Sequence, residues 1–505
     1  MEGCRQGCGR RPVSDERPLS TVLAPWRDDR RGRSRPRHTS RVGDVRRDTG
    51  PSPVRRPPAE HGSSDDERDL PVATWYANLT LIDGTGAAPK DGVSVRIDDD
   101  GTIGAIEHGA VEAADGVDVV DCAGTFLTPG LIDAHSHLGL ASEIDASMRL
   151  DVSVAETARD IFVACSDALD AGFTTIRDVG GLEGAVPDLI SRGRLRGPRV
   201  LTSGPVQCQT GGHGQMGPLW EPSDLFDSHE ILGLRTTAML GDGPDAIRRN
   251  VRETFRRGAD LIKMCVTGGV ITVGTDPRDT QLTIPEIRAA VEEAEARHTY
   301  VTVHAHNNAG VRAAVEAGVK CVEHGSEIDA EVADLMAAND VALVPTLAPR
   351  EILRERMRRI KENAGHGSDA YLAQFALAES LVAGMQEVIP IARKAGVLIG
   401  LGADITGPRQ KERAMELVLR AAVEDPMAAL VSATRDNARI CRLDDRIGTV
   451  EVGKIADLCL WSRSPVEDVN VFTDTEQLAL VLQGGMPVAG TRVEQAGVIG
   501  RVQPA

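Results

Sequence analysis

Short apolar runs alternate with amphipathic stretches through the middle of the chain. The runs are rich in Val, Ile and Leu, which is typical of buried parallel strands. Eight of them end at His137, Asp178, Ser203, Lys263, His304, His324, Thr346 and Asp404. Apolar residues recur at helical spacing in the intervals 154–171, 244–257, 284–297 and 331–339. Eight βα units over about 300 residues predict an α/β fold, a TIM (β/α)8 barrel, with its chemistry at the C-terminal ends of the strands.

The hydrophobic pattern changes on both sides of this region to short strands with alternating polar and apolar positions. The expected strands are 75–81, 93–97, 103–106 and 117–121 before it, and 457–461, 478–482 and 486–489 after it. Strand-rich segments at both ends predict one small composite β-sandwich domain. We therefore expect this domain to comprise residues 72–128 and 444–505, with the barrel over residues 129–443.

Two segments fit neither pattern. Residues 350–396 are polar and longer than one crossover helix, so we expect a helical insertion near the active-site mouth. Residues 1–71 hold 16 Arg, no Lys and 12 acidic residues among frequent Pro, Ser and Gly, which predicts a disordered tail. Three interpretations of this tail are open: a basic functional extension, a transit peptide with unusually many acidic residues, and the product of a start codon placed too early. We favour the third.

Composition limits the partners of the chain. Its 505 residues carry a formal net charge of −18, and without the basic tail the remainder carries −22. This charge argues against a nucleic acid or an acidic membrane as partner, and no apolar run is long enough to span a membrane. Nine cysteines without a repeated CxxC pattern indicate reduced thiols. We expect a cytoplasmic homo-oligomer.

Six residues of metal-ligand type stand at or near the predicted strand ends. They are His135, His137, Lys263, His304, His324 and Asp404. His135 and His137 lie two positions apart, and such side chains share one face of a strand and can chelate one ion together. Imidazoles and carboxylates are suitable ligands for Zn²⁺ and similar ions. The sequence therefore predicts two divalent metal ions, which we expect to be zinc, at the barrel mouth.

Lys263 is the unusual member of this set because an ammonium group repels a metal ion. Burial and nearby cations lower a lysine pKa, and the neutral amine can capture CO₂ as a carbamate whose two oxygens bridge two cations. Two such ions would activate a water molecule and polarise a carbonyl. Asp404 would accept the proton of the attacking water and return it to the leaving amine.

Seven motifs, taken in order, resemble signatures of the amidohydrolase superfamily. They are TPGLIDAHSH at 128–137, AGFTTIRDVGG at 171–181, GADLIK at 258–263, VHAH at 303–306, VEHG at 322–325, GAD at 402–404 and IGTVEVGKIADL at 447–458. The resemblance covers residues 72–492 and is nearest to Xaa-Pro dipeptidases and imidazolonepropionase-like hydrolases. It implies a buried metal on His135, His137, Lys263 and Asp404, and a second metal on Lys263, His304 and His324. The turn at 405–412 departs from the family pattern and leaves the substrate class open.

These features predict a binuclear metal-dependent hydrolase that cleaves the C–N amide bond of a small substrate. Dipeptides, N-acyl amino acids and related amides or carbamates all suit this chemistry. The alternatives are a one-metal deaminase, which would have no use for Lys263, and a non-catalytic scaffold, which would not need six ligands. The presence of Lys263 favours the amide hydrolase.

Several neighbouring polar residues have weaker functional signals. His213 and His306 are candidates for catalysis or substrate contact, with a loop-structuring role and a hydrogen bond behind the ligands as their respective alternatives. The turn at 267–270 presents backbone N–H groups to a substrate carboxylate, or is a simple βα turn. For Asp133 we expect a structural hydrogen-bonding role, and for Arg177 with Asp178 a network beneath the site.

Overall fold

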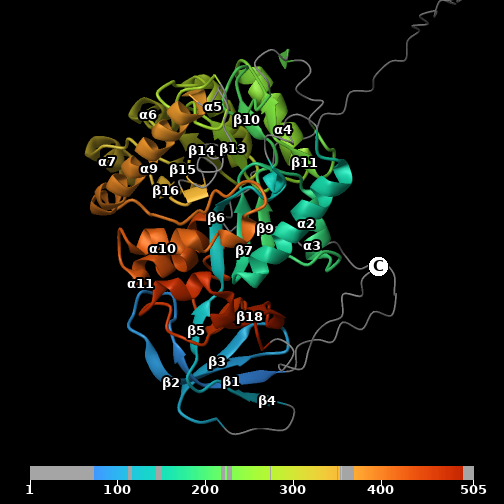
Figure 1. Cartoon of the computed structure of the whole chain (residues 1–505), viewed down its shortest axis with the longest axis vertical. Helices are drawn as coiled ribbons and strands as arrows, with labels where there is room; N and C mark the ends of the chain where they lie inside the picture. The colour runs from blue at the N-terminus through green and yellow to red at the C-terminus, as the bar shows by residue number, and fades with distance from the viewer. Residues whose placement is uncertain are drawn as a thin grey trace, which may run out of the picture. The chain divides into compact units, whose positions relative to one another are not determined.

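The computed structural model describes residues 73–492, apart from 112–116, 144–150, 218–221, 224–229, 273, 350, 353 and 355–368. The Arg-rich segment 1–71 and the last residues of the chain lie outside this part, so the expectations for them stay predictions. Figure 1 labels the elements within it.

Parallel strands form the centre of the fold, as the apolar runs predict (Figure 1). One parallel sheet has the order β6 (Leu131–Ser136), β7 (Phe173–Asp178) and β9 (Arg199–Thr202). A second parallel sheet has the order β12 (Ala238–Leu240), β10 (Val206–Cys208), β13 (Ile262–Cys265), β14 (Val301–Ala305), β15 (Cys321–His324) and β16 (Ala342–Val344). Almost every residue of these strands is buried. Side chains on both faces therefore need apolar neighbours, which explains the continuous Val, Ile and Leu runs.

Helices lie between the strands where helical periodicity predicts them. The longer ones are α2 (Val154–Asp170), α4 (Pro244–Arg256), α5 (Ile284–Glu295), α6 (Asn308–Ala317), α7 (Ala330–Ala338) and α9 (Asp369–Ala395). The shorter ones are α3 (Ala185–Ser191), α10 (Met415–Ala421), α11 (Pro426–Val431) and α12 (Asn437–Ile440). Local sequence sets their starts: Thr283 and Glu286 form a capping box before α5, and the Asn307 side chain caps α6.

The segment that ends at Asp404 differs from its prediction. We expected a regular strand here, but the segment has a single bridge, between Leu343 and Ile399. It still lies between β16 and β6: Gly400 N donates to Leu343 O at 2.9 Å, and Asp404 N donates to His135 O at 2.8 Å. Three other predicted strands end slightly early, at Ser136 in β6, Thr202 in β9 and Val344 in β16, and β13 and β14 run slightly further, to Cys265 and Ala305.

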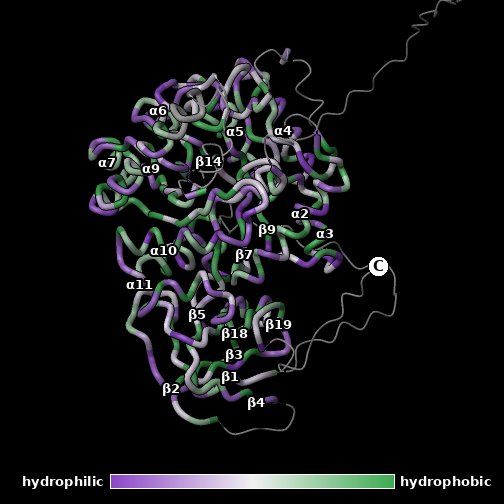
Figure 2. The backbone as a smooth tube through the Cα atoms, in the orientation of Figure 1, coloured by the Kyte–Doolittle hydropathy of each residue, from purple (hydrophilic) through white to green (hydrophobic). Residues whose placement is uncertain are grey.

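Strands from both ends of the described chain share one mixed sheet. Its order is β19 (Met486–Ala489), β18 (Leu478–Gln483), β17 (Leu458–Trp461), β5 (Phe126–Pro129), β1 (Thr74–Leu81), β2 (Lys90–Ile97) and β3 (Ile103–His108), and β4 (Asp118–Asp121) also pairs with β1. Strands from before and after the predicted barrel region therefore join, as the sequence predicts. They form one hydrogen-bonded sheet of eight strands rather than two separate sheets. Hydrophilic and hydrophobic residues are mixed along β1 to β3 (Figure 2), whereas β17 and β18 are apolar and buried almost throughout.

The predicted helical insertion is largely a single long helix. The insertion appears as α9, whose 27 residues include Pro390, while part of 350–368 lies outside the described residues. No described helix is both long and apolar enough to cross a membrane.

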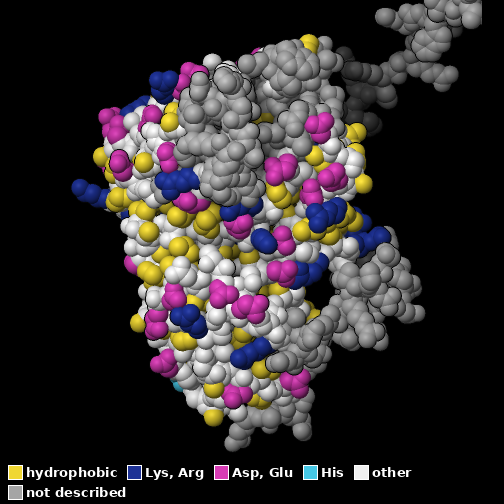
Figure 3. Space-filling view, viewed as in Figure 1, with side chains coloured by type: hydrophobic (Ala, Val, Ile, Leu, Met, Phe, Trp, Pro, Cys, Tyr) yellow, Lys and Arg dark blue, Asp and Glu magenta, His cyan; other side chains and the backbone are white. Residues whose placement is uncertain are grey.

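Seven cysteines of the described part are buried and unpaired: Cys122, Cys165, Cys208, Cys265, Cys321, Cys441 and Cys459. On the face in Figure 3, acidic and basic side chains are interspersed among neutral and apolar ones.

Candidate active site

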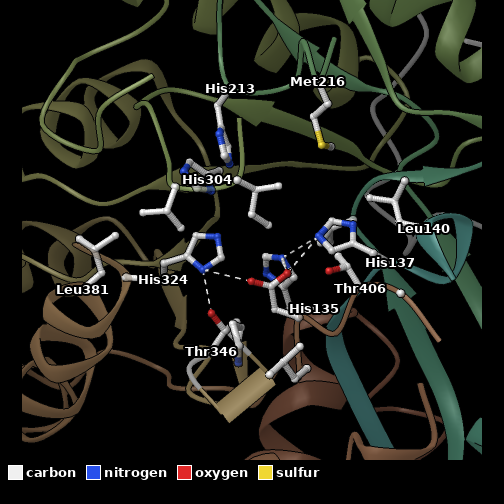
Figure 4. Close-up of a pocket in the computed structure, with 18 of the residues that line it drawn as sticks. His135, His137, Leu140, His213, Met216, His304, His324, Thr346, Leu381 and Thr406 are labelled. Carbon is white, nitrogen blue, oxygen red and sulfur yellow. Dashed lines mark hydrogen bonds and ion pairs between the residues drawn. The ribbon is translucent and has the colours of Figure 1, made fainter. Parts of the chain in front are cut away.

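His135 and His324, at the ends of β6 and β15, lie close together (Figure 4), and Asp404 joins them from the segment before Ile405. The ligand atoms of His135, His324 and Asp404 lie within 4.8 Å of one another. His137 joins them, because its Nε2 lies 3.2 Å from Asp404 Oδ1 and 3.3 Å from His135 Nε2. The structure therefore brings together four residues that the sequence places at the ends of three predicted strands.

Two members of this cluster have unusual backbone conformations. His324 has φ of 71° and Asp404 has φ of 49°, in the left-handed region that favours glycine. Residues held in such conformations cost on the order of 1–3 kcal/mol each and concentrate at functional sites. Both deviations aim side chains at the same point. Sequence reasoning had no signal for them, since neither position is a glycine or an asparagine.

His304, His306 and His213 extend the cluster on one side. The ring centroids of His304 and His324 are 4.6 Å apart, and those of His304 and His306 are also 4.6 Å apart. The His213 ring lies 4.4 Å from that of His304, on the loop after β10. All three rings line the same cavity as the cluster. The geometry thus leaves His213 and His306 within reach of a ligand bound at the cluster.

Lys263 lies within the same cavity, on β13 next to β14. It is buried, with only 3% of the residue exposed. Burial lowers the pKa of Lys263 more than Glu323, Cys265 and Asp404 raise it. A buried lysine with a lowered pKa more easily provides a neutral, nucleophilic amine than an exposed one does.

A buried ion pair supports His135 from below. Glu323 Oε2 lies 2.8 Å from His135 Nδ1, while its Oε1 accepts from Arg177 Nη2 at 2.7 Å and from the Thr302 hydroxyl. A carboxylate at Nδ1 fixes the ring so that Nε2 faces the cluster. Arg177 also donates to Ala134 O at 2.6 Å. We missed Glu323 in the sequence, although a carboxylate inside an apolar strand was a usable signal.

Two aspartates organise the backbone around the histidines, as expected. Asp133 accepts from the N–H groups of His135 and Ala403 at 3.1 and 3.0 Å, and from Arg413 at 2.7 Å. Asp178 accepts from Leu138 N at 2.6 Å and Gly180 N at 3.1 Å. Both therefore act on backbone geometry. Arg177 bonds to Glu323 rather than to Asp178, so the network beneath the site has two separate parts.

The turn after β13 uses its own N–H groups. Gly268 N donates to Asp279 O at 3.0 Å, and Gly269 N donates to Thr275 Oγ1 at 3.3 Å. Because these two donors already have partners, the interpretation as a simple βα turn is favoured. The His304 ring, whose Nε2 lies 3.1 Å from Gly268 O, rests against this turn.

The protonation of the cluster suits cation binding. Burial lowers the pKa values of His304 and His324 well below the ordinary value, and lowers that of His306 to about 3 and that of His213 to about 4. Burial raises the pKa of Asp404, but the neighbouring histidines outweigh it and hold this pKa well below its ordinary value. The site therefore presents neutral imidazoles and an ionised carboxylate.

His137 is the exception. Burial lowers its pKa, but the hydrogen bond and charge of Asp404 outweigh burial and raise it. A divalent cation beside the same carboxylate would favour the neutral ring instead, because a nearby positive charge disfavours imidazolium. The donor set of neutral nitrogens and carboxylate oxygens fits a borderline divalent metal such as zinc.

The cluster opens into a cavity of about 880 Å³. Its walls combine the histidines with apolar side chains of α9 and of the loops after β10 and β13. The turn at 405–412, whose sequence differs from the family pattern, contributes Thr406, Gly407, Pro408, Arg409 and Glu412 to the lining. A concave site of this size, apolar with a few convergent polar groups, is suited to a small organic substrate.

Several known proteins resemble this chain in both sequence and fold. The amidohydrolase family model matches residues 126–488. Ochratoxinase from Aspergillus niger is 30% identical over 370 residues, covering 71% of this chain and 75% of that protein. A prolidase structure in complex with N-methylphosphonate-L-proline is 31% identical, with a TM-score of 0.75 over 83% of this chain and all of that one. A Xaa-Pro dipeptidase with bound methionine is 29% identical, with a TM-score of 0.71 over 82% of this chain and 99% of that one.

The family match covers well over half of the chain, and the relatives that share about 30% identity are hydrolases. Members of this family generally bind divalent metals, which agrees with the His135, His324 and Asp404 cluster. The chain belongs to the amidohydrolase family and is a hydrolase that acts on carbon–nitrogen bonds.

Proposed function

We propose that the chain is a binuclear metal-dependent hydrolase that cleaves an amide bond in a dipeptide or an N-acyl amino acid. The observation that carries this proposal is the convergence of His135, His324 and Asp404 within 4.8 Å, in a cavity that Lys263 and His304 also line. The similarity to a prolidase, a Xaa-Pro dipeptidase and an ochratoxinase supports the choice of an amide as substrate.

The residues divide into ligands and proton carriers. The ligands would be His135, His137, Lys263 as its carbamate, His304, His324 and Asp404. When bound, two divalent cations, with zinc expected, would supply Lewis acidity towards water and the scissile carbonyl. Asp404, which the neighbouring histidines keep ionised, would accept a proton from the attacking water because its carboxylate faces the cluster. It then returns this proton to the departing amine nitrogen.

His306 and His213 would contact the substrate. Their lowered pKa values keep both rings neutral at physiological pH, so each can donate one hydrogen bond and accept another. His306 Nδ1 lies 2.8 Å from Ser326 Oγ, which directs its other nitrogen away from that hydroxyl. For His213 the buried Nδ1 has no hydrogen-bond partner among the described residues. In this proposal both rings would orient the carbonyl or the carboxylate of the substrate.

We also propose that the two parallel sheets close into one TIM barrel over residues 129–443. Hydrogen bonds link β16 to the segment 398–404 and that segment to β6, and at the other seam Asp260 N, just before β13, donates to Thr202 O of β9 at 2.8 Å. The mixed sheet would curl into a sandwich over 72–128 and 444–505, because Val95 of β2 and Leu480 of β18 share one core. Unpaired buried cysteines are consistent with a cytoplasmic enzyme.

The first test is metal content per chain, measured by plasma mass spectrometry on protein purified without chelators in bicarbonate. We expect about two equivalents, followed by turnover of dipeptides or N-acyl amino acids. The Lys263→Ala variant should lose one equivalent and nearly all activity. Added bicarbonate or short carboxylates should partly restore it. One equivalent in the parent would favour the deaminase instead, and full activity of Lys263→Ala would exclude the carbamate.

A further inference from the structure

The cavity has two unlike walls, on opposite sides of the histidines (Figure 4). Leu381 marks the wall beside His324, and Leu140 and Thr406 mark the wall beyond His137. Apolar side chains from α9 and from the segment after β16 line the first wall: Pro349, Ile352, Ala378, Leu381, Val382 and Met385. The chain segments of the second wall also supply the charged lining residues Glu143, Arg409 and Glu412.

The α9 wall is one continuous stripe of the helix. Ala378, Leu381, Val382 and Met385 follow the spacing at which side chains share one helical face. All four are between 3% and 6% exposed. Val382 and Met385 also belong to the hydrophobic core that includes Val388, but Val388 does not line the cavity. The stripe is therefore an apolar surface that faces a cavity.

This stripe begins immediately behind the candidate metal ligands. Met385 Sδ lies 3.8 Å from the hydroxyl of Thr346, and that hydroxyl lies 2.8 Å from Nδ1 of His324. A carbonyl group bound at the cluster would thus have its attached chain directly beside α9. Charged or strongly hydrated groups would lose water here without gaining partners.

We infer that the substrate is an N-acyl amino acid with a bulky apolar acyl group, which packs against the α9 wall. This inference rests on the proposed function and selects among its substrates. The cavity of about 880 Å³ is near the upper end of the range for small-molecule sites, which suits a group larger than the side chains of most dipeptides. On the opposite wall, Arg409 is paired with the Glu412 carboxylate through Nε–Oε1 at 2.8 Å and through Nη2–Oε2, so the amino-acid end of the substrate would face a polar, charged wall.

The experiment compares N-acetyl-, N-hexanoyl- and N-decanoylglycine as substrates of the metal-loaded enzyme. Burial of each methylene group is worth roughly a fourfold change in affinity, so kcat/KM should rise tenfold or more from acetyl to hexanoyl. A matched pair of variants locates the effect on α9. Val382→Thr and Val388→Thr make the same isosteric change at residues that are 4% and 3% exposed, but only Val382 lines the cavity. Val382→Thr should lower the preference for the decanoyl substrate about fivefold, and Val388→Thr should leave it unchanged.

Binding to the metal-free protein separates this inference from the proposed function. N-Decanoylglycine should bind with a negative heat-capacity change in calorimetry, and Val382→Thr should weaken that binding. Binding without turnover after metal loading would support the apolar site and overturn the proposed hydrolysis. A flat kcat/KM series, or equal effects of the two valine variants, would overturn the inference while leaving amide hydrolysis in place.

Discussion

Replacing Arg177 by Met should strongly destabilise the fold because it leaves the Glu323 carboxylate buried without its cation. Both side chains are fully buried, and they are 2.7 Å apart. Burial raises the pKa of Glu323, but Arg177 and His135 outweigh it and hold this pKa well below the ordinary value. Removal of one partner from such a pair costs about 3–5 kcal/mol. Over the roughly 420 residues from 73 to 492, that loss corresponds to a Tm decrease of about 3–6 °C.

The assay is a thermodynamic cycle by calorimetry at one fixed scan rate. The double variant Arg177→Met/Glu323→Gln has no buried charge and similar volume, so its Tm should return to within about 2 °C of the parent. The exposed pair Arg312 and Glu331, 3.0 Å apart, provides the control: Arg312→Met should change Tm by less than about 1 °C. The single variant Glu323→Gln completes the cycle. If Arg177→Met also stays within about 1 °C of the parent Tm, or if the Tm decreases of Arg177→Met and Glu323→Gln simply add in the double variant, the buried pair does not stabilise this site.

Two further predictions concern residues around the strand ends. Burial raises the pKa of Glu416 well above its ordinary value, against the opposing effects of Arg420 and two backbone N–H groups. The folded state therefore holds a proton that the unfolded state releases above about pH 4.3, and stability should fall with rising pH by up to about 1.4 kcal/mol per unit. Glu416→Gln should remove this slope and be more stable than the parent at pH 9 in urea titrations; parallel pH profiles would contradict it. A Cβ at Gly402 would overlap the Cβ of His135. Gly402→Ala should therefore lower the free energy of unfolding by about 1–3 kcal/mol and lower the metal content by displacing the histidine. Unchanged metal binding would show that the histidine does not move.

Local patterns were sufficient to predict most of the parallel strands and the histidines that meet in the cavity. The HxH pair at 135–137 and the apolar run before His324 depend only on residues adjacent in sequence, and β6 and β15 place them as expected. Glu323 could not be assigned a role because its partner Arg177 is 146 positions away. The irregular segment before Asp404 has the composition of a strand, and only its position between β16 and β6 reveals the difference. The apolar stripe of α9 has the same helical pattern as its core-facing residues, so periodicity alone could not separate cavity from core.

The shared mixed sheet has a consequence for synthesis of the chain on the ribosome. Strand β5 pairs with β17, in a register that places Phe126 opposite Trp461. About 330 residues separate these partners, which corresponds to roughly 20–65 s of translation. During that interval one edge of β5 lacks its neighbour, and an open strand edge is a template for pairing with other chains. Translation speed and chaperone supply should therefore affect the yield of this protein more than the stability of its finished fold does.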